Sequence, residues 1–183
     1  MLRTTRYWTL TAAAARFGRR VHLMTDPSDG PHELRVPVFS NGVPQGEETL
    51  PVVPLGGRRY RLLASPGFVE GLAAGDEFEL DTGAIRGVRV LRRGGNLCVW
   101  FYHSEPLDET SEATADVRGV AESLGGCLDG GYSRMLVLTI PLAAGFDAVA
   151  AAFDEAVRRH GGSAWLYGNV YDPSDGITPL NWW

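Results

Sequence analysis

The chain has 183 residues, of which 44% are hydrophobic and 21% are charged, and its formal net charge is −5. These values are typical of a globular protein of one or two small domains and argue against a disordered chain. No apolar run reaches the roughly 18–20 residues that cross a bilayer. Polar or bulky residues also interrupt any signal-peptide core near the N-terminus, namely Trp8, Thr9, Thr11 and Arg16. We therefore expect a cytoplasmic protein with no membrane partner.

All basic side chains except the histidines are arginine, which excludes Schiff-base, P-loop and general-base chemistry by lysine. The charge is unevenly divided along the chain. Residues 1–95 carry 13 Arg and 10 acids, a net of +3, whereas residues 96–183 carry 4 Arg and 12 acids, a net of −8. This asymmetry is a functional hint, because a dense acidic surface suits a basic partner.

Residues 1–95 are predicted to be rich in strands. Short runs of valine, leucine and aromatic residues alternate about every ten residues with glycine, proline, asparagine and aspartate clusters. The expected strands are 20–26, 32–40, 48–55, 59–64, 76–81 and 85–93. Asn41-Gly42 is a strong signal for a tight turn. This pattern predicts a small β-barrel-like N-terminal half.

The stretch 57–81 raises the question of whether it is a catalytic loop or the corner of a barrel. In "DEFELD", Phe78 and Leu80 alternate with acids, so the strand should have one buried and one wet face. Gly75 supplies the backbone freedom to enter that strand. We expect "PGFVEGLAA" (66–74) to form a short helical turn that plugs a barrel end, and this favours a barrel corner over an active site.

Residues 96–183 are predicted to alternate strands and helices. Strands are expected at 96–103, around 127–132, at 134–142 and at 163–171. The first helix, 111–125, carries the apolar stripe Ala113, Val117, Val120 and Leu124. The second begins at a cap by Asp147, carries Val149, Phe153, Ala156 and Val157, and ends at Gly161. The order βαββαβ is typical of a ferredoxin-like half.

The predicted fold class is therefore α+β, with a β-rich domain at 1–95 and a ferredoxin-like domain at 96–183 that ends in a loop-like tail. The best boundary is the "RRGG" stretch at 92–95. Trp182 and Trp183 end the chain. Such terminal aromatic residues either dock back into the fold or lie at an interface.

These segments together resemble an uncharacterised bacterial family, domain of unknown function 4265. The resemblance covers roughly residues 32–170 and consists of a tyrosine-led strand with a proline corner, a "GLAxGD" strand entry, a "GN" strand opening and an "LG" helix end. The matching positions are Tyr60, Pro66, Gly71, Leu72, Ala73, Gly75, Asp76, Gly95, Asn96, Leu124 and Gly125. The chain departs from the family in "ASPGFV", where an aromatic residue is usual after the proline, and beyond residue 170. The resemblance implies a fold and a bacterial origin, and no activity.

Catalytic and metal-binding patterns are weak. The histidines His22, His32, His103 and His160 lack metal-ligand spacing, so no metal and no cofactor is expected. Cys98 and Cys127 are too few for a thiolate zinc site, and we expect them to be buried and inert. No serine-hydrolase elbow occurs. The pairs Glu77/Glu79 and Glu79/Asp81 have a spacing that suits acid–base chemistry, but a solvated strand face explains them better.

Three functions remain open. The leading one is a non-enzymatic binding protein whose acidic second half docks a partner protein, for instance one that neutralises a basic toxin or nuclease in the manner of an immunity protein. Its partner-binding residues would be Asp108, Glu109, Glu112, Asp116 and Glu122. The alternative is an enzyme or small-ligand binder with a site between the halves that uses His103, Glu105 and Arg134. The third is nucleic-acid binding through Arg58, Arg59, Arg61, Arg86, Arg89, Arg92 and Arg93, which the acidic overall charge makes less attractive.

Overall fold

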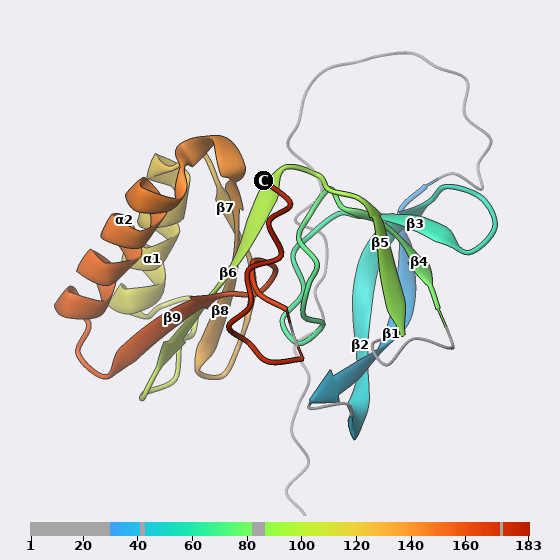
Figure 1. Ribbon diagram of the computed structural model, residues 1–183. Coiled ribbons are helices and arrows are strands. Elements are labelled where there is room, and N and C mark those ends of the chain that lie inside the picture. Colours follow the sequence, from blue (N-terminus) through green and yellow to red (C-terminus); the bar gives the residue numbers. More distant parts are fainter. Residues whose placement is uncertain (1–29, 41–42, 82–86, 173) are drawn as a thin grey trace, which may run out of the picture.

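The computed structural model describes residues 30–40, 43–81, 87–172 and 174–183 (Figure 1). Several predicted features lie outside the described residues: the N-terminal segment, the strand at 20–26 with His22, the Asn41-Gly42 turn, and Arg86.

The first sheet is a five-stranded antiparallel meander in the order β1-β2-β3-β4-β5. Its strands are β1 (His32–Ser40), β2 (Val43–Pro54), β3 (Arg59–Leu62), β4 (Glu77–Leu80) and β5 (Val88–Arg92). Each predicted strand after residue 30 is present, because alternating apolar residues supply one buried face. That face gathers around Val36, Leu50, Val52, Leu62 and Phe78, all at most 2% exposed.

The β-rich half is an open sheet and not a closed barrel. Among the described residues, no ladder pairs β1 with β5. The sheet curls until the two edges approach, since a Cβ added to Gly87 would lie 2.5 Å from the Pro37 ring. Proline has no N–H, and a bulge between Val38 and Phe39 further distorts β1. These features prevent β1 from offering a regular ladder to β5.

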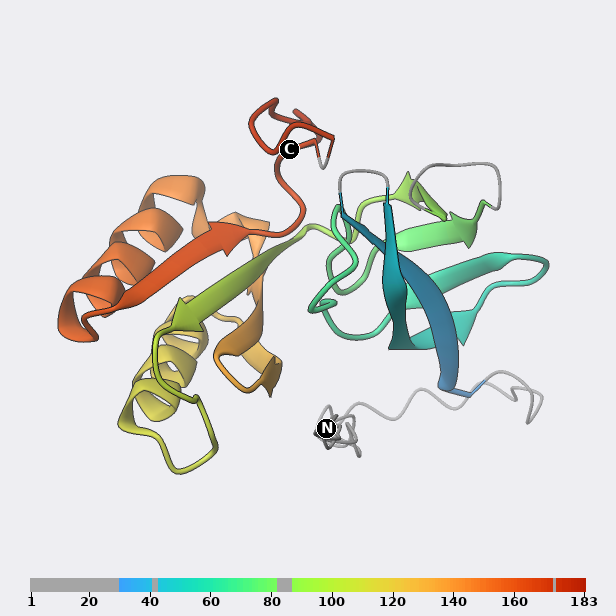
Figure 2. The ribbon, with the colours of Figure 1, turned by 90° about the horizontal axis from the view of Figure 1, so that it is seen from below.

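The second sheet has four antiparallel strands in the order β7-β8-β6-β9. The strands are β6 (Asn96–His103), β7 (Cys127–Tyr132), β8 (Met135–Pro141) and β9 (Ser163–Tyr167). The helix α1 (Glu112–Ser123) follows β6, and α2 (Phe146–Arg159) follows β8 after the short 3-10 turn η2 (Leu142–Ala144). Both helices lie on the same face of the sheet (Figures 1 and 2). The predicted order of elements is thus present, and the described part of the chain is a mixed α/β structure with two antiparallel sheets and two α-helices.

The main core lies between the helices and the second sheet. The inward residues of β6, Leu97, Val99 and Phe101, are fully buried against Val117 of α1 and Phe153 of α2. The helical stripes therefore face the core as predicted, and the partly buried members Val120, Leu124 and Val157 pack at its margin. The predicted cap of α2 is wrong. Gly145 is the N-cap with φ +82°, and Asp147 lies in the first turn, where its charge still complements the helix dipole.

The two sheets use separate parts of the chain and divide at residues 93–95. The division into independent domains at 1–95 and 96–183 stays a prediction. In the described part of the chain, no helix has the length and apolarity that a bilayer crossing requires.

Candidate functional site

One irregular segment, residues 63–76, runs between the two sheets (Figure 1). The prediction that residues 66–74 form a helical turn is wrong, because their backbone N–H groups are taken up by side chains and by the second half. Val69 and Leu72 enter the core of the first sheet, while Ala73 packs against Cys98 and Trp100 on the second. We call this segment and its contacts the seam.

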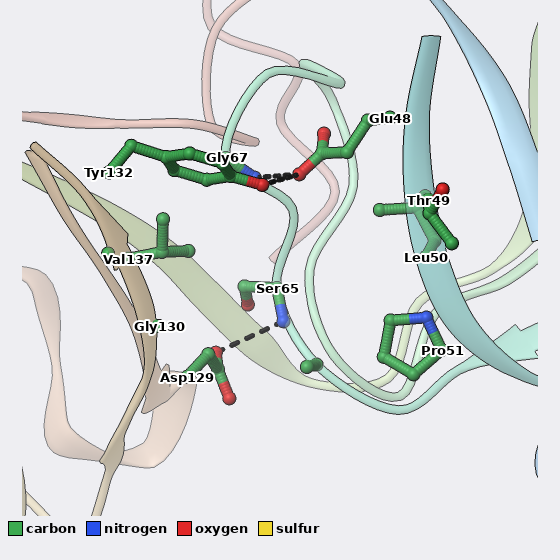
Figure 3. Close-up of a pocket in the computed structure, with 12 residues that line it drawn as sticks. Glu48, Thr49, Leu50, Pro51, Ser65, Gly67, Asp129, Gly130, Tyr132 and Val137 are labelled. Atoms are coloured by element: carbon green, nitrogen blue, oxygen red, sulfur yellow. Dashed lines mark hydrogen bonds between the residues drawn. The ribbon is translucent and has the colours of Figure 1, made fainter. Parts of the chain in front are cut away.

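Glu48 anchors the seam from the first sheet. Its side chain points from β2 into the seam (Figure 3) and accepts hydrogen bonds from the backbone N–H groups of Gly67, Phe68 and Val69 at 2.6, 2.9 and 3.0 Å. The Tyr132 hydroxyl donates to the same carboxylate at 3.4 Å. Burial raises the pKa of Glu48, because its effect is larger than that of the hydrogen-bond donors, which lower the pKa. Burial beside Glu48 also raises the pKa of Tyr132 to about 12. The carboxylate thus replaces the hydrogen bonds that a helix would give this segment.

Asp129 anchors the seam from the second sheet. It accepts the backbone N–H of Ser65 at 3.0 Å (Figure 3) and the hydroxyl of Thr139 at 2.5 Å. The Ser65 and Thr139 hydroxyls are 2.5 Å apart, and Ala74 N–H donates to Ser65 Oγ at 3.1 Å. Burial raises the pKa of Asp129. No imidazole contacts this hydroxyl chain among the described residues, so Ser65 lacks the base that activates a serine nucleophile.

Asp76 closes the seam where the halves join. It is fully buried and accepts hydrogen bonds from Ala73 N–H, Gly94 N–H and the Arg93 guanidinium at 3.1, 2.7 and 2.9 Å. Burial raises its pKa in spite of these partners. Gly75, with φ +85°, packs against Gly94. This close approach supports a structural corner over a catalytic loop for residues 57–81. The stretch is a structural corner of an open sheet.

The C-terminal tail docks beside this corner. Trp182 donates its indole N–H to Asn169 O at 2.8 Å, and the Arg93 guanidinium lies 4.9 Å from the Trp182 ring centroid. Trp183 packs edge-on against Phe146. Of the two possibilities for the terminal aromatics, docking into the fold is the one that the structure adopts.

The cavity at the seam is small. It is lined by Glu48, Ser65, Asp129 and Tyr132 among others, and its volume is about 20 Å³. About 10–15 Å³ is needed to hold one water molecule, so this space fits one water and no metabolite. In the described ranges, no group of three or more His, Cys, Asp or Glu side chains is arranged to hold a metal ion.

The two thiols are unreactive as placed. Cys98 is fully buried, and burial raises its pKa well above the ordinary value. Cys127 lies at the surface, and partial burial beside Asp129 raises its pKa to about 11. The expectation of burial is therefore wrong for Cys127. Thr139 of β8 lies between the two cysteines, because it is the strand partner of Cys98 in β6 and of Cys127 in β7. Their Cα atoms are therefore two strand spacings apart, about 9.5 Å, which is too far for a disulfide.

The structure brings His103, Glu105 and Arg134 to one end of the second sheet. His103 N–H donates to Arg134 O at 3.0 Å, and the Glu105 N–H donates to His103 Nδ1 at 3.0 Å. The first is a contact between backbone groups, and the second joins the imidazole to the backbone of the following turn. No hydrogen bond or ion pair joins the Glu105 carboxylate or the Arg134 guanidinium to the imidazole in the described structure, and both residues are exposed.

The predicted partner-binding acids lie on and before α1, but they are not equivalent. The Asp108 carboxylate accepts the N–H and hydroxyl of Thr110 and so shapes the turn before the helix. Asp116 is held by Arg159 at 2.8 Å and by His160 Nε2 at 2.8 Å. Glu109, Glu112 and Glu122 are exposed, and no ion pair reaches them from the described residues. We call these five acids the acidic surface.

The arginines of the first sheet are mostly neutralised by their neighbours. Glu77 accepts Arg61 at 3.0 Å and Arg92 at 2.7 Å, and Glu79 accepts Arg89 at 2.5 Å. Each pair joins adjacent strands, so the ladder itself places the opposite charges side by side. Arg93 is bound to Asp76, while Arg58 and Arg59 are exposed. Most arginines of this face are therefore bound in ion pairs within the sheet. Their partners, Glu77 and Glu79, are the acids that the sequence placed on the solvent side of β4.

Sequence reasoning did not single out Glu48, Ser65 or Asp129. Glu48 did leave a signal, because it shares the inward side of β2 with Leu50 and Val52. A carboxylate at an apolar position of an alternating strand faces the protein interior, where it needs hydrogen-bond donors to offset the loss of water. Ser65 and Asp129 carry no comparable signal, because their contact joins residues 64 positions apart.

Comparison with known proteins agrees with this architecture. A hypothetical protein from Neisseria gonorrhoeae has a similar structure, with a TM-score of 0.56 and 12% identity over 81% of this chain and 96% of that chain. At that identity the likeness shows the fold alone. No curated protein matches the chain significantly. The model of the family described as domain of unknown function DUF4265 matches residues 48–165, which include the seam segment, the first sheet from within β2 onward and most of the second sheet. The chain is therefore a member of the DUF4265 family.

Proposed function

We propose that this protein is a non-catalytic binding protein whose acidic surface docks a basic protein. The supporting observation is the contrast between the two halves. The arginines of the first sheet are largely paired with acids on neighbouring strands, whereas Glu109, Glu112 and Glu122 have no ion pair from the described residues. The excess negative charge of residues 96–183 is thus available to an external partner, where it accelerates association and orients the complex.

The chemistry of the seam favours binding over catalysis. Its three acids, Glu48, Asp76 and Asp129, each accept hydrogen bonds from backbone N–H groups and so have a structural role in the seam. Cys98 is an inert thiol, and the cavity has room for a water molecule only. The hypothesis of an enzyme therefore depends on half-buried His103 and on the exposed residues Glu105 and Arg134. Nucleic-acid binding is disfavoured because most of the arginines that it would use are bound to acids of the protein.

The test compares two double charge reversals. Glu112→Arg/Glu122→Arg changes exposed, unpaired acids of α1, and Asp116 is left intact because Arg159 and His160 depend on it. The matched control is Glu33→Arg/Glu47→Arg on the exposed face of β1 and β2, which alters the net charge equally. Wild type and both variants are immobilised and exposed to lysate of the source organism at two salt concentrations.

We expect a basic protein to bind wild type and the control, and its association rate with the α1 variant to fall at least about tenfold. Raised salt should have a similar effect on wild type, because the screening length is only about 8 Å at physiological ionic strength. Equal rates for both variants, or binding that salt does not alter, would refute the proposal. Loss of binding in His103→Ala with unchanged α1 variants would favour the alternative site.

A more specific role, neutralisation of a basic toxin or nuclease, belongs to the same proposal. It requires that the captured protein be a toxin or nuclease whose activity this protein inhibits. A neighbouring open reading frame for such a protein would support the role, whereas a metabolic operon would point to the enzyme reading.

We also infer a ferredoxin-like fold for the second half. The inference is supported by the order βαββαβ and by the position of β6 and β8, the first and third strands of this half, at the centre of its sheet. An experimental structure in which β7 and not β8 neighbours β6 would contradict it.

A further inference from the structure

The outer edge of β9 differs from the other three sheet edges. Exposed edges template the addition of another strand, and proteins normally protect them with charges, prolines or bulges. β1 carries Pro37 and a bulge, β5 carries Arg89 and Arg92, and β7 has a bulge between Leu128 and Gly130. β9 reads "SAWLY", with no charge and no proline, and its pairing with β6 is free of bulges. It runs along the outside of the four-stranded sheet (Figure 2).

The hydrogen-bond pattern shows which groups of β9 face outward. Gly168 N–H donates to Cys98 O at 2.8 Å, and Ser104 N–H donates to Gly162 O at 3.0 Å. These bonds fix the alternation of the antiparallel ladder with β6. The backbone groups of Ala164 and Leu166 therefore point toward β6, and those of Ser163, Trp165 and Tyr167 point away from the sheet. No backbone hydrogen bond from the described residues reaches these outward groups.

The side chains on this edge are also incompletely covered. Leu166 pairs with Trp100 on the face of the sheet that carries the seam, and it is 44% exposed. Ala164, two residues earlier on the same face, is exposed. A large and a small apolar residue thus stand side by side next to a row of free backbone groups.

We propose that this edge binds a second copy of the chain through antiparallel β9–β9 pairing about a two-fold axis at Trp165. With that axis, the outward residues form three hydrogen-bonded pairs and exchange about six backbone hydrogen bonds. Leu166 of each chain then faces Ala164 of the other chain. The large residue meets the small one twice, so the edge is complementary to itself.

The self-complementary ladder supports a second copy as the occupant. Two chains of net charge −5 repel one another, and Asp154 of α2 accepts the Trp165 indole N–H at 2.8 Å beside the proposed axis. The backbone hydrogen bonds and the Leu166–Ala164 contacts must outweigh this repulsion, and the β9 ladder itself adds no acid to it. The basic partner of the proposed function is a different occupant, because basic side chains would gain nothing from an uncharged strand. The two proposals use different surfaces and can fail independently.

The test measures self-association by sedimentation velocity over a wide range of protein concentration. We expect wild type to pass from monomer to dimer. Leu166→Glu places a charge against Ala164 of the other chain and should raise the dissociation constant at least about tenfold. Leu91→Glu is the matched control, because Leu91 is 40% exposed on the edge strand of the other sheet, and it should leave the dimer unchanged.

A second pair of variants tests the register. Ala164→Arg alone should also weaken the dimer. Ala164→Arg combined with Leu166→Glu should restore it, because each glutamate then faces an arginine of the other chain. Circular dichroism verifies that each variant is folded. If Leu166→Glu does not fold, Ala164→Arg alone provides the test. A chain that remains monomeric at all concentrations would overturn the proposal, and so would a dimer that is insensitive to both single variants.

Discussion

Glu48→Gln tests whether the buried carboxylate holds the seam. The substitution keeps the shape of the side chain but replaces one acceptor oxygen by an amide NH₂. The amide oxygen can keep Phe68 and Val69, which share Oε2, but the NH₂ then faces the N–H of Gly67, which is bound to Oε1 at 2.6 Å. A buried donor left without an acceptor costs about 1–3 kcal/mol. Glu48→Ala strands all three donors and should cost at least about 3 kcal/mol, a large share of the roughly 5–15 kcal/mol that stabilises a domain.

The assay is urea denaturation together with amide hydrogen exchange at residues 67–69. Glu47→Gln is the control, because Glu47 directly precedes Glu48 in β2, is exposed, and forms only a long ion pair of 3.9 Å with Arg35. It should change the free energy of unfolding by less than about 0.5 kcal/mol. Exchange at Gly67 should accelerate in the Glu48 variants only. Equal effects of the two glutamine variants on stability, with unchanged exchange at Gly67, would refute the reasoning.

Two further predictions concern the seam. Gly75→Val should lower the free energy of unfolding by at least about 1 kcal/mol, because Gly75 has φ +85° and a Cβ there would lie 3.3 Å from Gly94 Cα. Gly161→Val, at a glycine with open space around it, should be nearly neutral in the same urea titration, and equal effects would contradict the corner. Asp129→Asn should flatten part of the pH dependence of stability. Burial raises the folded-state pKa of Asp129 above the ordinary value of 3.8, so the stability contributed by its protonated form is fully present below about pH 4 and is lost as the pH rises through the folded pKa. Wild type should therefore lose stability relative to Asp129→Asn as the pH rises from 4 to 7, and the opposite slope in urea titrations would contradict the assignment.

The sequence was sufficient for the elements whose periodicity is local. In β6 and β8, continuous apolar runs bounded by glycine and proline predicted strands close to those observed, and the stripes of α1 and α2 predicted which helix faces are buried. The alternation of "DEFELD" predicted that Phe78 is buried and Glu77 and Glu79 are outward. The family resemblance, carried by Tyr60, Gly75-Asp76 and Gly95-Asn96, was likewise readable from the chain and is confirmed.

Errors arose where a local pattern competes with long-range partners. Residues 66–74 look like a helical turn, but Glu48 accepts three of their backbone N–H groups, and a helix cannot form while those donors are bound elsewhere. Asp147 looks like a helix cap, yet the N-cap of α2 is Gly145, two residues earlier. The closed barrel failed because proline and a bulge interrupt β1.

By itself, the sequence determined the strands and helices, the charge imbalance between the halves and the absence of lysine chemistry, since all of these depend on residue type and short spacing. Only the tertiary structure decided what the charges do. It paired Arg61, Arg89 and Arg92 with acids on adjacent strands and left Glu112 and Glu122 unpaired among the described residues. It also brought Glu48, Asp76 and Asp129 to one seam, the first two buried and the third half-buried. Contacts between Ser65 and Asp129, or Glu48 and Tyr132, span 64 and 84 residues, and no local pattern records them because the free energy that forms them comes from packing two sheets against one shared segment.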